Sequence, residues 1–452
     1  MHDLLGLSID GRVATRADAD WDQARAAWNL AVDQQPEAVA FAESAADVAS
    51  IVRYAGEHSL RVTAQSTGHG AAALGSLQDT ILIKTERMRG IEVDGARRTA
   101  RVQAGALSLA LGAAAQEHSL CSLPGSAEDV GVVGYTLGGG LGWLGRKHGF
   151  ACNRVVAIEL VTAAGEQRRV DAEADPELFW ALRGGGGGFA IVTALHISLL
   201  PIADVYAGAL ILPAELGASA VRSYRDWAVH TPEEVTSIVR FLRLPPLPEV
   251  PEPLRDRPLL TIGAACIGAE AEGERLIAPL REIGEPLLDT FAQIPSSGLT
   301  SIHMDPPNPV PALGHHRVIA ELPDAAIEAF VSVSGAEADS PLLLAELRHA
   351  GGALARAPRD AGALDKLDGE FVMFGVGVPA TEPLREAIAE RLDLLDDTMR
   401  PWASEGGYLN FAERPCDVDA ILPAETCARL RDVKRAWDPE GIIRGAHELS
   451  IA

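Results

Sequence analysis

Three short glycine-rich segments constrain this chain more than any other feature of its sequence. They are residues 66–70, 138–142 and 184–188. Glycine lacks a Cβ atom, so the backbone in such segments can approach a ligand closely and donate N–H groups to a pyrophosphate. The segments therefore favour a fold in which several turns converge on one long ligand. The alternative is that the glycines serve only for tight packing.

One glycine pattern resembles a dinucleotide-binding fingerprint. Gly140, Gly142 and Gly145 match G-x-G-x-x-G, and Glu159 follows near the place of the ribose-binding carboxylate of a Rossmann fold. However, several strand–helix units precede the motif, and it lies within a longer glycine run. The earlier turn that holds His69 has no role in such a site. The NAD-dependent interpretation is therefore kept only as an alternative.

The first part of the chain is predicted to alternate strands and helices. Strands are expected at residues 60–64, 80–85, 98–104, 131–137 and 155–161. Ser44, with Asp47 three residues later, predicts the start of a helix. Asp175 before Pro176 predicts another, because aspartate caps helices well and proline fits the first turn.

The pattern changes beyond Pro201. Strands are expected at residues 205–212, 235–242, 259–265, 342–347 and 371–376. Amphipathic helices are expected at residues 270–283 and 383–399, and a further helix at 423–437. This arrangement predicts a sheet with helices on one face, so the fold class is α+β.

Charge and cysteine usage exclude several classes of protein. The net charge of −24 should repel nucleic acid and anionic membranes. The five cysteines are scattered, and the His315–His316 pair has no carboxylate at ligand spacing, so we expect no metal site. No signal peptide or membrane span is visible. We expect a cytoplasmic protein that acts on small molecules.

Five motifs, taken in order, resemble the berberine-bridge-enzyme-like FAD-linked oxidases of the p-cresol methylhydroxylase/vanillyl-alcohol oxidase superfamily. The motifs are RVTAQSTGHG at residues 61–70, VQAGA at 102–106, VGVVGYTLGGG at 130–140, LFWALRGGG at 178–186 and YLNF at 408–411. Each motif is weak alone, but their shared order is specific. The resemblance covers the first two hundred residues and the final segment, whereas the middle of the chain carries no recognisable motif.

This resemblance implies a two-lobed protein. Residues 1–203 would form an FAD-binding domain of the p-cresol methylhydroxylase type, to which residues 406–452 return. Residues 204–405 would form an inserted antiparallel-sheet substrate domain. The turn Ser66, Thr67, Gly68, His69 and Gly70 would wrap the pyrophosphate of FAD. The cofactor channel would be lined by Ser126, Gly131, Gly134 and Gly140, with Ile191 nearby.

The resemblance also implies a covalent flavin. His69 matches the histidine that bonds to the 8α-methyl carbon of FAD, a reaction that needs a neutral imidazole nitrogen as nucleophile. A histidine that only hydrogen-bonds the cofactor or caps the turn is the alternative. Many relatives carry a second link through a cysteine, but that position is Ala127 here, so we expect no cysteinyl link.

Two tyrosines are the predicted catalytic residues. Tyr408 matches the tyrosine of the family's Y-x-N motif, which can act as a base when its pKa is lowered; the alternative is a hydrogen-bonded wall residue. Tyr135 could donate a hydrogen bond to the reduced flavin, or could merely pack. Asn410 is expected to hold the cofactor, and Glu346 is a further candidate base whose facing the sequence does not fix.

The predicted function is an FAD-dependent oxidoreductase that transfers a hydride from a C–OH or C–N centre to flavin N5. Dioxygen or another acceptor would then reoxidise the flavin. The alternative is a non-redox flavoprotein, such as a cyclase, an isomerase or a binding protein that uses FAD as a scaffold. The sequence indicates neither the substrate nor the oligomeric state.

Overall fold

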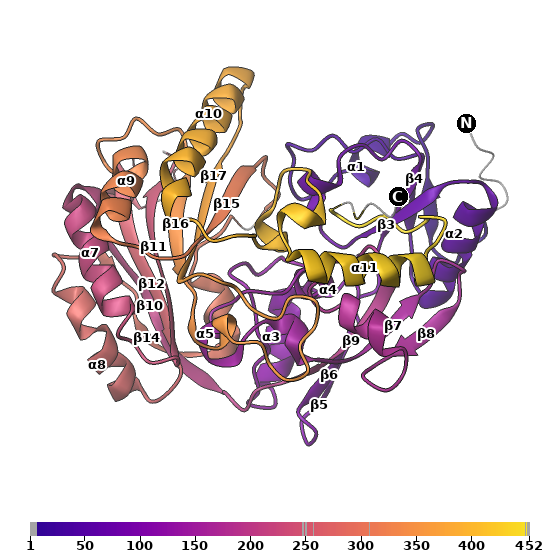
Figure 1. The fold of residues 1–452 in the computed structure, drawn as a ribbon, viewed down its shortest axis with the longest axis horizontal. Coiled ribbons are helices and arrows are strands. Elements are labelled where there is room, and N and C mark those ends of the chain that lie inside the picture. Colours follow the sequence, from indigo (N-terminus) through magenta and orange to yellow (C-terminus); the bar gives the residue numbers. More distant parts are fainter. Residues whose placement is uncertain are drawn as a thin grey trace.

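The computed structural model describes residues 7–245, 248, 251–255, 257–306, 308–447 and 449. The chain forms two lobes that lie side by side (Figure 1). The early part of the chain and the final segment form one lobe, and the middle part forms the other. The ends of the predicted domains, residues 1–6 and 450–452, lie outside the described residues.

The first lobe is built on two small sheets. One has the order β1-β2-β4-β3, in which β2, β4 and β3 run parallel, and its strands are β1 (Arg12–Ala14), β2 (Ala38–Phe41), β4 (Thr80–Lys84) and β3 (Arg61–Gln65). Helix α2 (Ala45–Glu57) packs on it, and the Ser44 side chain caps that helix by accepting from the Asp47 N–H, as predicted. Every residue of β4 is buried, as is usual for a strand inside a parallel sheet.

The second sheet of this lobe is antiparallel, in the order β5-β6-β9-β7-β8. Its strands are β5 (Ile91–Asp94), β6 (Thr99–Gln103), β9 (Ile191–Ser198), β7 (Val155–Val161) and β8 (Gln167–Val170). Short helices lie between the strands: α1 (Trp21–Ala24), α3 (Ser108–Gln116), α5 (Gly145–His148) and α6 (Pro176–Ala181). The predicted strands at 60–64, 80–85, 98–104 and 155–161 correspond to β3, β4, β6 and β7.

The prediction of a strand at residues 131–137 is wrong, because this segment forms helix α4 (Val132–Leu137). Its buried residues are Val132, Val133, Thr136 and Leu137, which share one helical face. A short apolar run between two glycines does not distinguish a buried strand from a buried helical turn. The helix at Pro176 does form, but Asp175 lies in the left-handed region (φ 56°) and its side chain makes no capping bond.

The second lobe is an antiparallel sheet of eight strands, as expected. Seven follow the order β13-β10-β12-β11-β16-β17-β15, and β14 pairs with β10. The strands are β10 (Asp204–Pro213), β11 (Val235–Arg243), β12 (Pro258–Cys266), β13 (Leu288–Asp289), β14 (Ala292–Pro295), β15 (Leu313–Ile319), β16 (Leu344–His349) and β17 (Phe371–Gly377). The edge strand β15, which carries His315 and His316, was not predicted.

Helices cover one face of this sheet (Figure 1). They are α7 (Gly217–Ala228), α8 (Glu270–Arg281), α9 (Asp324–Ser334) and α10 (Glu382–Met399). On the opposite face, Val205, Ile238 and Ala265 pack against Trp143 of the first lobe. The uncovered side of the sheet therefore faces the first lobe, which places charged side chains of that side at the junction of the lobes.

The final segment returns to the first lobe. Helix α11 (Ala424–Trp437) leads to Ile442 and Ile443, which lie beside β3. The Val62 N–H donates to the Ile442 carbonyl at 2.8 Å. The buried Lys434 ammonium binds Asp438 and also donates to the carbonyls of Gly188 and Ile443, each at 2.6 Å. The domain limits at residues 203 and 405 stay a prediction.

Within the described residues, no helix is long and apolar enough to cross a membrane. The same residues include no group of three or more His, Cys, Asp or Glu side chains placed to hold a metal ion.

Candidate active site

The turn after β3 presents His69 at the surface of the first lobe. Gly68 has a φ of +94°, and a Cβ atom there would lie 2.8 Å from Ala27, so this position requires glycine. The Thr67 carbonyl accepts a hydrogen bond of 2.8 Å from the Trp28 N–H, which ties the turn to the segment after α1. The sequence of the turn therefore fixes where the histidine projects.

Three neighbours restrain the His69 ring. It stacks on the Trp28 indole, with ring centroids 4.1 Å apart and 20° between the planes. The Thr67 hydroxyl lies 2.8 Å from Nδ1 in a hydrogen bond, and Nε2 lies 3.4 Å from an Asp129 carboxylate oxygen. A proton on Nε2 would face the carboxylate and leave the Nδ1 lone pair for the hydroxyl, a tautomer assigned from these neighbours.

Asp129 is itself held in place. The Trp28 indole N–H donates to its carboxylate. Burial raises the pKa of the Asp129 carboxyl, but the interactions with His69 and Trp28 outweigh burial and hold the pKa below its usual value. Trp28 and Asp129 thus form two sides of a clamp around His69, and sequence reasoning identified neither of them.

The surroundings of the turn fit an extended ligand. Ser66 Oγ is a buried polar atom that has no hydrogen-bond partner within the described part of the chain. A Cβ atom on Gly131 would lie 2.7 Å from Ser66 Oγ, so only glycine permits this approach. Open space surrounds the places where Gly70 and Gly134 lack a side chain. These residues fit a nucleotide cofactor such as FAD.

Other predicted cofactor residues have different surroundings. A Cβ atom on Gly140 (φ +81°) would lie 2.5 Å from Ala151, so packing alone accounts for this glycine. The Ile191 side chain lies in the hydrophobic core beside the parallel sheet. Ser126 is half-buried in the loop that leads to Asp129. Their roles toward a cofactor stay predictions.

Tyr408 is fully buried, and its hydroxyl oxygen accepts two hydrogen bonds. The donors are the Leu141 N–H at 2.7 Å and Asn410 Nδ2 at 3.0 Å. Burial raises the pKa of the Tyr408 phenol above its usual value, although these two donors oppose the rise. A tyrosine base needs a lowered pKa, so this environment favours the hydrogen-bonded wall residue over the base.

Asn410 joins the final segment to α4. Its Nδ2 atom also donates to the Tyr135 carbonyl at 2.8 Å, and a Cβ atom on Gly138 would lie 1.9 Å from its Oδ1 atom. The Asn410 side chain therefore needs glycine at residue 138. Its bonds hold Tyr408 in place, which is a structural duty beyond the cofactor contact predicted for it.

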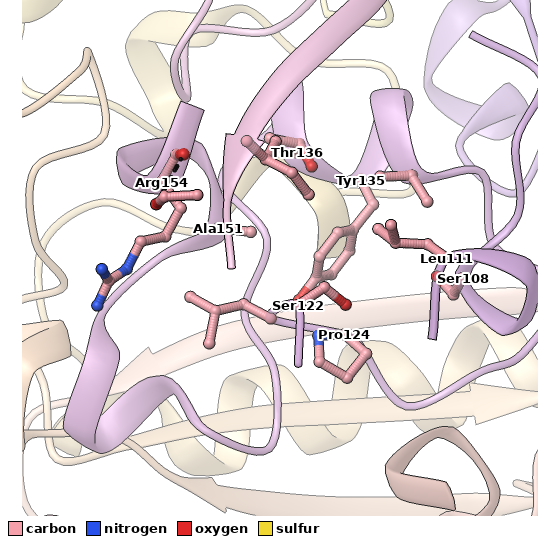
Figure 2. A pocket seen from close by; sticks show the side chains of 12 residues that line it. Ser108, Leu111, Ser122, Pro124, Tyr135, Thr136, Ala151 and Arg154 are labelled. Atoms are coloured by element: carbon pink, nitrogen blue, oxygen red, sulfur yellow. Dashed lines mark hydrogen bonds between the residues drawn. The ribbon is translucent and has the colours of Figure 1, made fainter. Parts of the chain in front are cut away.

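The Tyr135 hydroxyl makes no hydrogen bond to Tyr408 within the described residues. The Tyr135 ring extends into a small cavity beside Ser122 and Pro124 (Figure 2). The cavity volume is about 20 Å³, enough for about one water molecule. The Tyr135 hydroxyl is buried without a hydrogen-bond partner in the described structure, and burial holds the pKa of the phenol well above its usual value. These features favour a packing role.

A buried charge cluster occupies the sheet face opposite the covering helices. It consists of Arg240 on β11, His303 and Asp305 in the segment before β15, and Glu346 and Arg348 on β16. The Glu346 carboxylate binds Arg348 Nε at 2.5 Å and His303 Nε2 at 2.8 Å. On the other side of the ring, His303 Nδ1 lies 2.5 Å from Asp305.

These cations decide the state of Glu346, the candidate base. Burial raises the pKa of its carboxyl, but Arg348, His303 and Arg240 outweigh burial and lower the pKa to about 2. Glu346 is therefore an ionised, paired carboxylate, and a weak base. Its neighbour Arg348 lies with its guanidinium carbon 5.0 Å from the centre of the Phe411 ring.

An aromatic wall connects the charge cluster with the final segment. Phe411 meets Tyr408 edge to face at 5.0 Å between ring centroids and lies 4.9 Å from Phe374 of β17. His316 of β15 accepts a 2.8 Å hydrogen bond from the Tyr408 N–H and is buried, which lowers the pKa of its imidazole to about 3. His316 is thus a neutral ring that packs beside the aromatic wall and holds the backbone of Tyr408.

Comparisons with known proteins agree with this geometry. Residues 36–171 match the FAD binding domain family. The (R)-6-hydroxynicotine oxidase of Paenarthrobacter nicotinovorans is 30% identical over 294 residues, which cover 63% of this chain and 61% of that protein. The chain spans about three fifths of the length of the first curated relatives that it matches.

Solved structures match over the whole chain. The 6-hydroxy-D-nicotine oxidase from Arthrobacter nicotinovorans superposes with a TM-score of 0.84 at 25% identity, covering 100% of both chains. Glucooligosaccharide oxidase from Acremonium strictum, which carries a 6-S-cysteinyl, 8α-N1-histidyl FAD, gives a TM-score of 0.82 at 22% identity over 98% of both chains. The second of these likenesses shows the fold alone.

Proposed function

The chain belongs to the FAD-linked oxidoreductases of the p-cresol methylhydroxylase/vanillyl-alcohol oxidase superfamily, and from this premise we propose that it oxidises a small organic substrate. The reaction would remove a hydride from a carbon that bears a hydroxyl or an amine. The relatives include a nicotine oxidase and an oligosaccharide oxidase. The relatives alone therefore leave both substrate classes open.

The glycine-lined bed around residues 66–70 and Gly131 would hold FAD, which supplies a two-electron acceptor when bound. The unpartnered Ser66 hydroxyl would gain a hydrogen-bond partner there, and Gly134 leaves room beside the bed. His69 would carry the flavin covalently through Nδ1. No second attachment is expected, because Ala127 offers no nucleophile.

One observation carries this proposal: His69 is restrained on three sides. Stacking on Trp28, the Thr67 hydroxyl at Nδ1 and the Asp129 carboxylate near Nε2 fix both the ring and its tautomer. A histidine that merely capped the turn would need no such arrangement. A restrained ring loses little freedom when it bonds to a cofactor, which favours attachment at this residue.

The attachment is tested by denaturing the purified protein in acid. Flavin colour should stay with the precipitate, and the peptide that carries His69 should gain the mass of FAD. The peptide that carries Cys121 and Ala127 should be unmodified, which serves as the internal control. His69→Ala should release all flavin into the supernatant; flavin that stays bound to the precipitate of this variant would refute the assignment.

The wall of Tyr408, Phe411 and Phe374 would bind and orient the substrate. Tyr408 would act as a neutral phenol that contacts the substrate, held by Leu141 and Asn410. Tyr135 would support α4 from behind. Dioxygen or another acceptor would take up the electrons, and peroxide release separates the two cases. A cytoplasmic location stays a prediction for cell fractionation.

A non-redox flavoprotein is the remaining alternative. It predicts that no substrate bleaches the bound flavin without air. Anaerobic mixing with a panel of alcohols and amines, followed at the visible flavin absorption, tests this directly. Bleaching by any member of the panel excludes the alternative.

A further inference from the structure

A second cavity lies between the two lobes, beside the aromatic wall. Its volume is about 310 Å³, at the lower end of the range for small-molecule sites. Ala72, which follows the His69 turn, lines it together with Leu313 and Gly314 of β15. Leu392 of α10 and Glu413 of the final segment also line it, and the remaining lining residues are Ala312, Ala389, Asp393 and Arg414. The cavity thus joins elements of both lobes.

Glu413 continues the aromatic wall into this cavity. A Cβ atom on Gly314 would lie 2.6 Å from Glu413 Oε2 and 2.9 Å from Phe374 Cζ. The carboxyl and the Phe374 ring therefore meet above the same glycine, and Phe374 in turn packs on Phe411. Because Gly314 has no side chain, the Glu413 carboxyl and the Phe374 ring can both pack against β15 at this point.

One oxygen of the Glu413 carboxyl lacks a hydrogen-bond partner, and no cation is paired with this acid among the described contacts. Its Oε2 atom is buried without a hydrogen bond to any described residue. Burial raises the pKa of the carboxyl to about 7, and the backbone of Gly314 only partly opposes the rise. The cation that lines the cavity, Arg414, binds Asp393 at 2.7 Å. A buried carboxylate without a counter-ion is costly unless a ligand pairs with it.

We propose that this cavity binds the ammonium group of an organic amine, with Glu413 as its anionic partner. The inference rests on the proposed function and narrows it, since it selects the C–N class over the C–OH class of substrate. Leu313, Leu392 and Ala72 would contact the hydrocarbon part of the amine. The net charge of −24 favours the approach of cations.

A hydroxylated substrate would not use these features. A hydroxyl can bond to a carboxyl but supplies no charge, so the buried Glu413 would stay without a counter-ion. An ammonium ion both neutralises the carboxylate and donates to Oε2. Glu413 would act as a positioning residue, because the cavity wall places it beside the aromatic wall and none of its contacts involves His69.

The test uses a pair of probes that cannot be oxidised. α,α-Dimethylbenzylamine and 2-phenyl-2-propanol have similar shapes, and neither has a hydrogen on the carbon that bears the nitrogen or oxygen. Isothermal titration calorimetry on the holoenzyme at pH 8 should show at least about tenfold tighter binding of the amine. Glu413→Gln should reduce this preference to less than about threefold.

Glu390→Gln is the matched control, because Glu390 is an exposed residue of α10 that does not line the cavity. This variant removes the same charge and should keep the full preference for the amine. Wild-type affinity for the amine should fall about tenfold between pH 8 and pH 6, because protonation of Glu413 removes the anion while the amine stays charged. Glu413→Gln should show no such fall.

Equal binding of amine and alcohol by the wild type would overturn the inference, as would an amine preference that survives Glu413→Gln or disappears in Glu390→Gln. These outcomes are separate from the proposed function. A protein that retains covalent flavin but binds both probes equally would lose only the amine assignment. A protein without flavin that still prefers the amine would lose only the oxidase assignment.

Discussion

Removal of the Glu346 carboxylate should destabilise the substrate lobe strongly. Glu346→Ala leaves Arg348, Arg240 and His303 buried without their central anion. Two charge-assisted hydrogen bonds are lost, at 2.5 Å and 2.8 Å, and the residue is 0% exposed. Breaking a buried ion pair from one side costs about 3–5 kcal/mol. For a lobe of this size, that cost corresponds to a fall in melting temperature of roughly 6–20 °C.

The matched control is an exposed pair with similar distances. Glu233 binds Arg356 through two contacts of 2.5 Å and 2.8 Å, but the two side chains are 36% and 60% exposed. Glu233→Ala should cost less than about 1 kcal/mol, because water screens the pair and replaces its hydrogen bonds. Differential scanning calorimetry of the two variants, at equal flavin content, measures both shifts.

Acid should reproduce the effect of the substitution. The folded pKa of Glu346 is about 2, below the ordinary value for glutamate. Its stabilising contribution is therefore fully present above the unfolded pKa of about 4.3 and is lost as the pH falls from there toward 2. Glu346→Ala should flatten the decline over this window. Equal falls in melting temperature for Glu346→Ala and Glu233→Ala would refute burial as the cause of the large contribution of Glu346 to stability. A decline of stability in acid that Glu346→Ala leaves unchanged would refute it as well.

Three further predictions follow from the site. Gly138→Ala should lower the melting temperature, because the new Cβ atom would lie 1.9 Å from Asn410 Oδ1 and break two hydrogen bonds worth about 1 kcal/mol each; Asn410→Ala combined with Gly138→Ala should cost no more than Asn410→Ala alone. Tyr408→Phe should cost about 1–3 kcal/mol of stability by leaving the Leu141 N–H unpaired. If Tyr408 is a wall residue, Tyr408→Phe should lower kcat by less than about tenfold and leave the pH profile of activity unchanged, whereas the loss of a catalytic base would lower kcat by roughly 10²–10⁴-fold. Asp129→Asn should lower the fraction of flavin that stays with acid-precipitated protein, because the His69 tautomer loses its charged partner; an unchanged fraction would show that Asp129 does not restrain the ring.

The sequence predicted the elements whose signals are local. Ser44 and Asp47 indicated the start of α2, and the strand predicted at residues 235–242 corresponds to β11. The prediction for residues 131–137 failed because their apolar side chains suit both a buried strand and a buried turn of helix. Only the tertiary packing of the segment between Gly131 and Gly138 decides which of the two forms. Strand β15 was not predicted, because His315, His316 and Arg317 interrupt the apolar pattern of this edge strand.

The site was only partly predictable for a related reason. His69 was found because a glycine turn presents it within five residues of sequence, whereas its clamp brings in Trp28 and Asp129 from distant segments. Glu346 and Arg348 are two residues apart on one strand, so their side chains could be expected on the same face of the sheet. The side of the sheet, and the arrival of His303, depend on tertiary structure.

The return of the final segment has a consequence for how the protein is made. Residues 442–444 pair with the edge strand β3, although the entire substrate lobe lies between Val62 and Ile443 in the sequence. Domains fold as units during synthesis, so the inserted lobe can complete its sheet while the lobe that surrounds His69 still lacks an edge. We therefore expect the glycine-lined bed around residues 66–70 to become complete only after Lys434, Asp438 and Ile443 have been translated, so that FAD would bind late in synthesis.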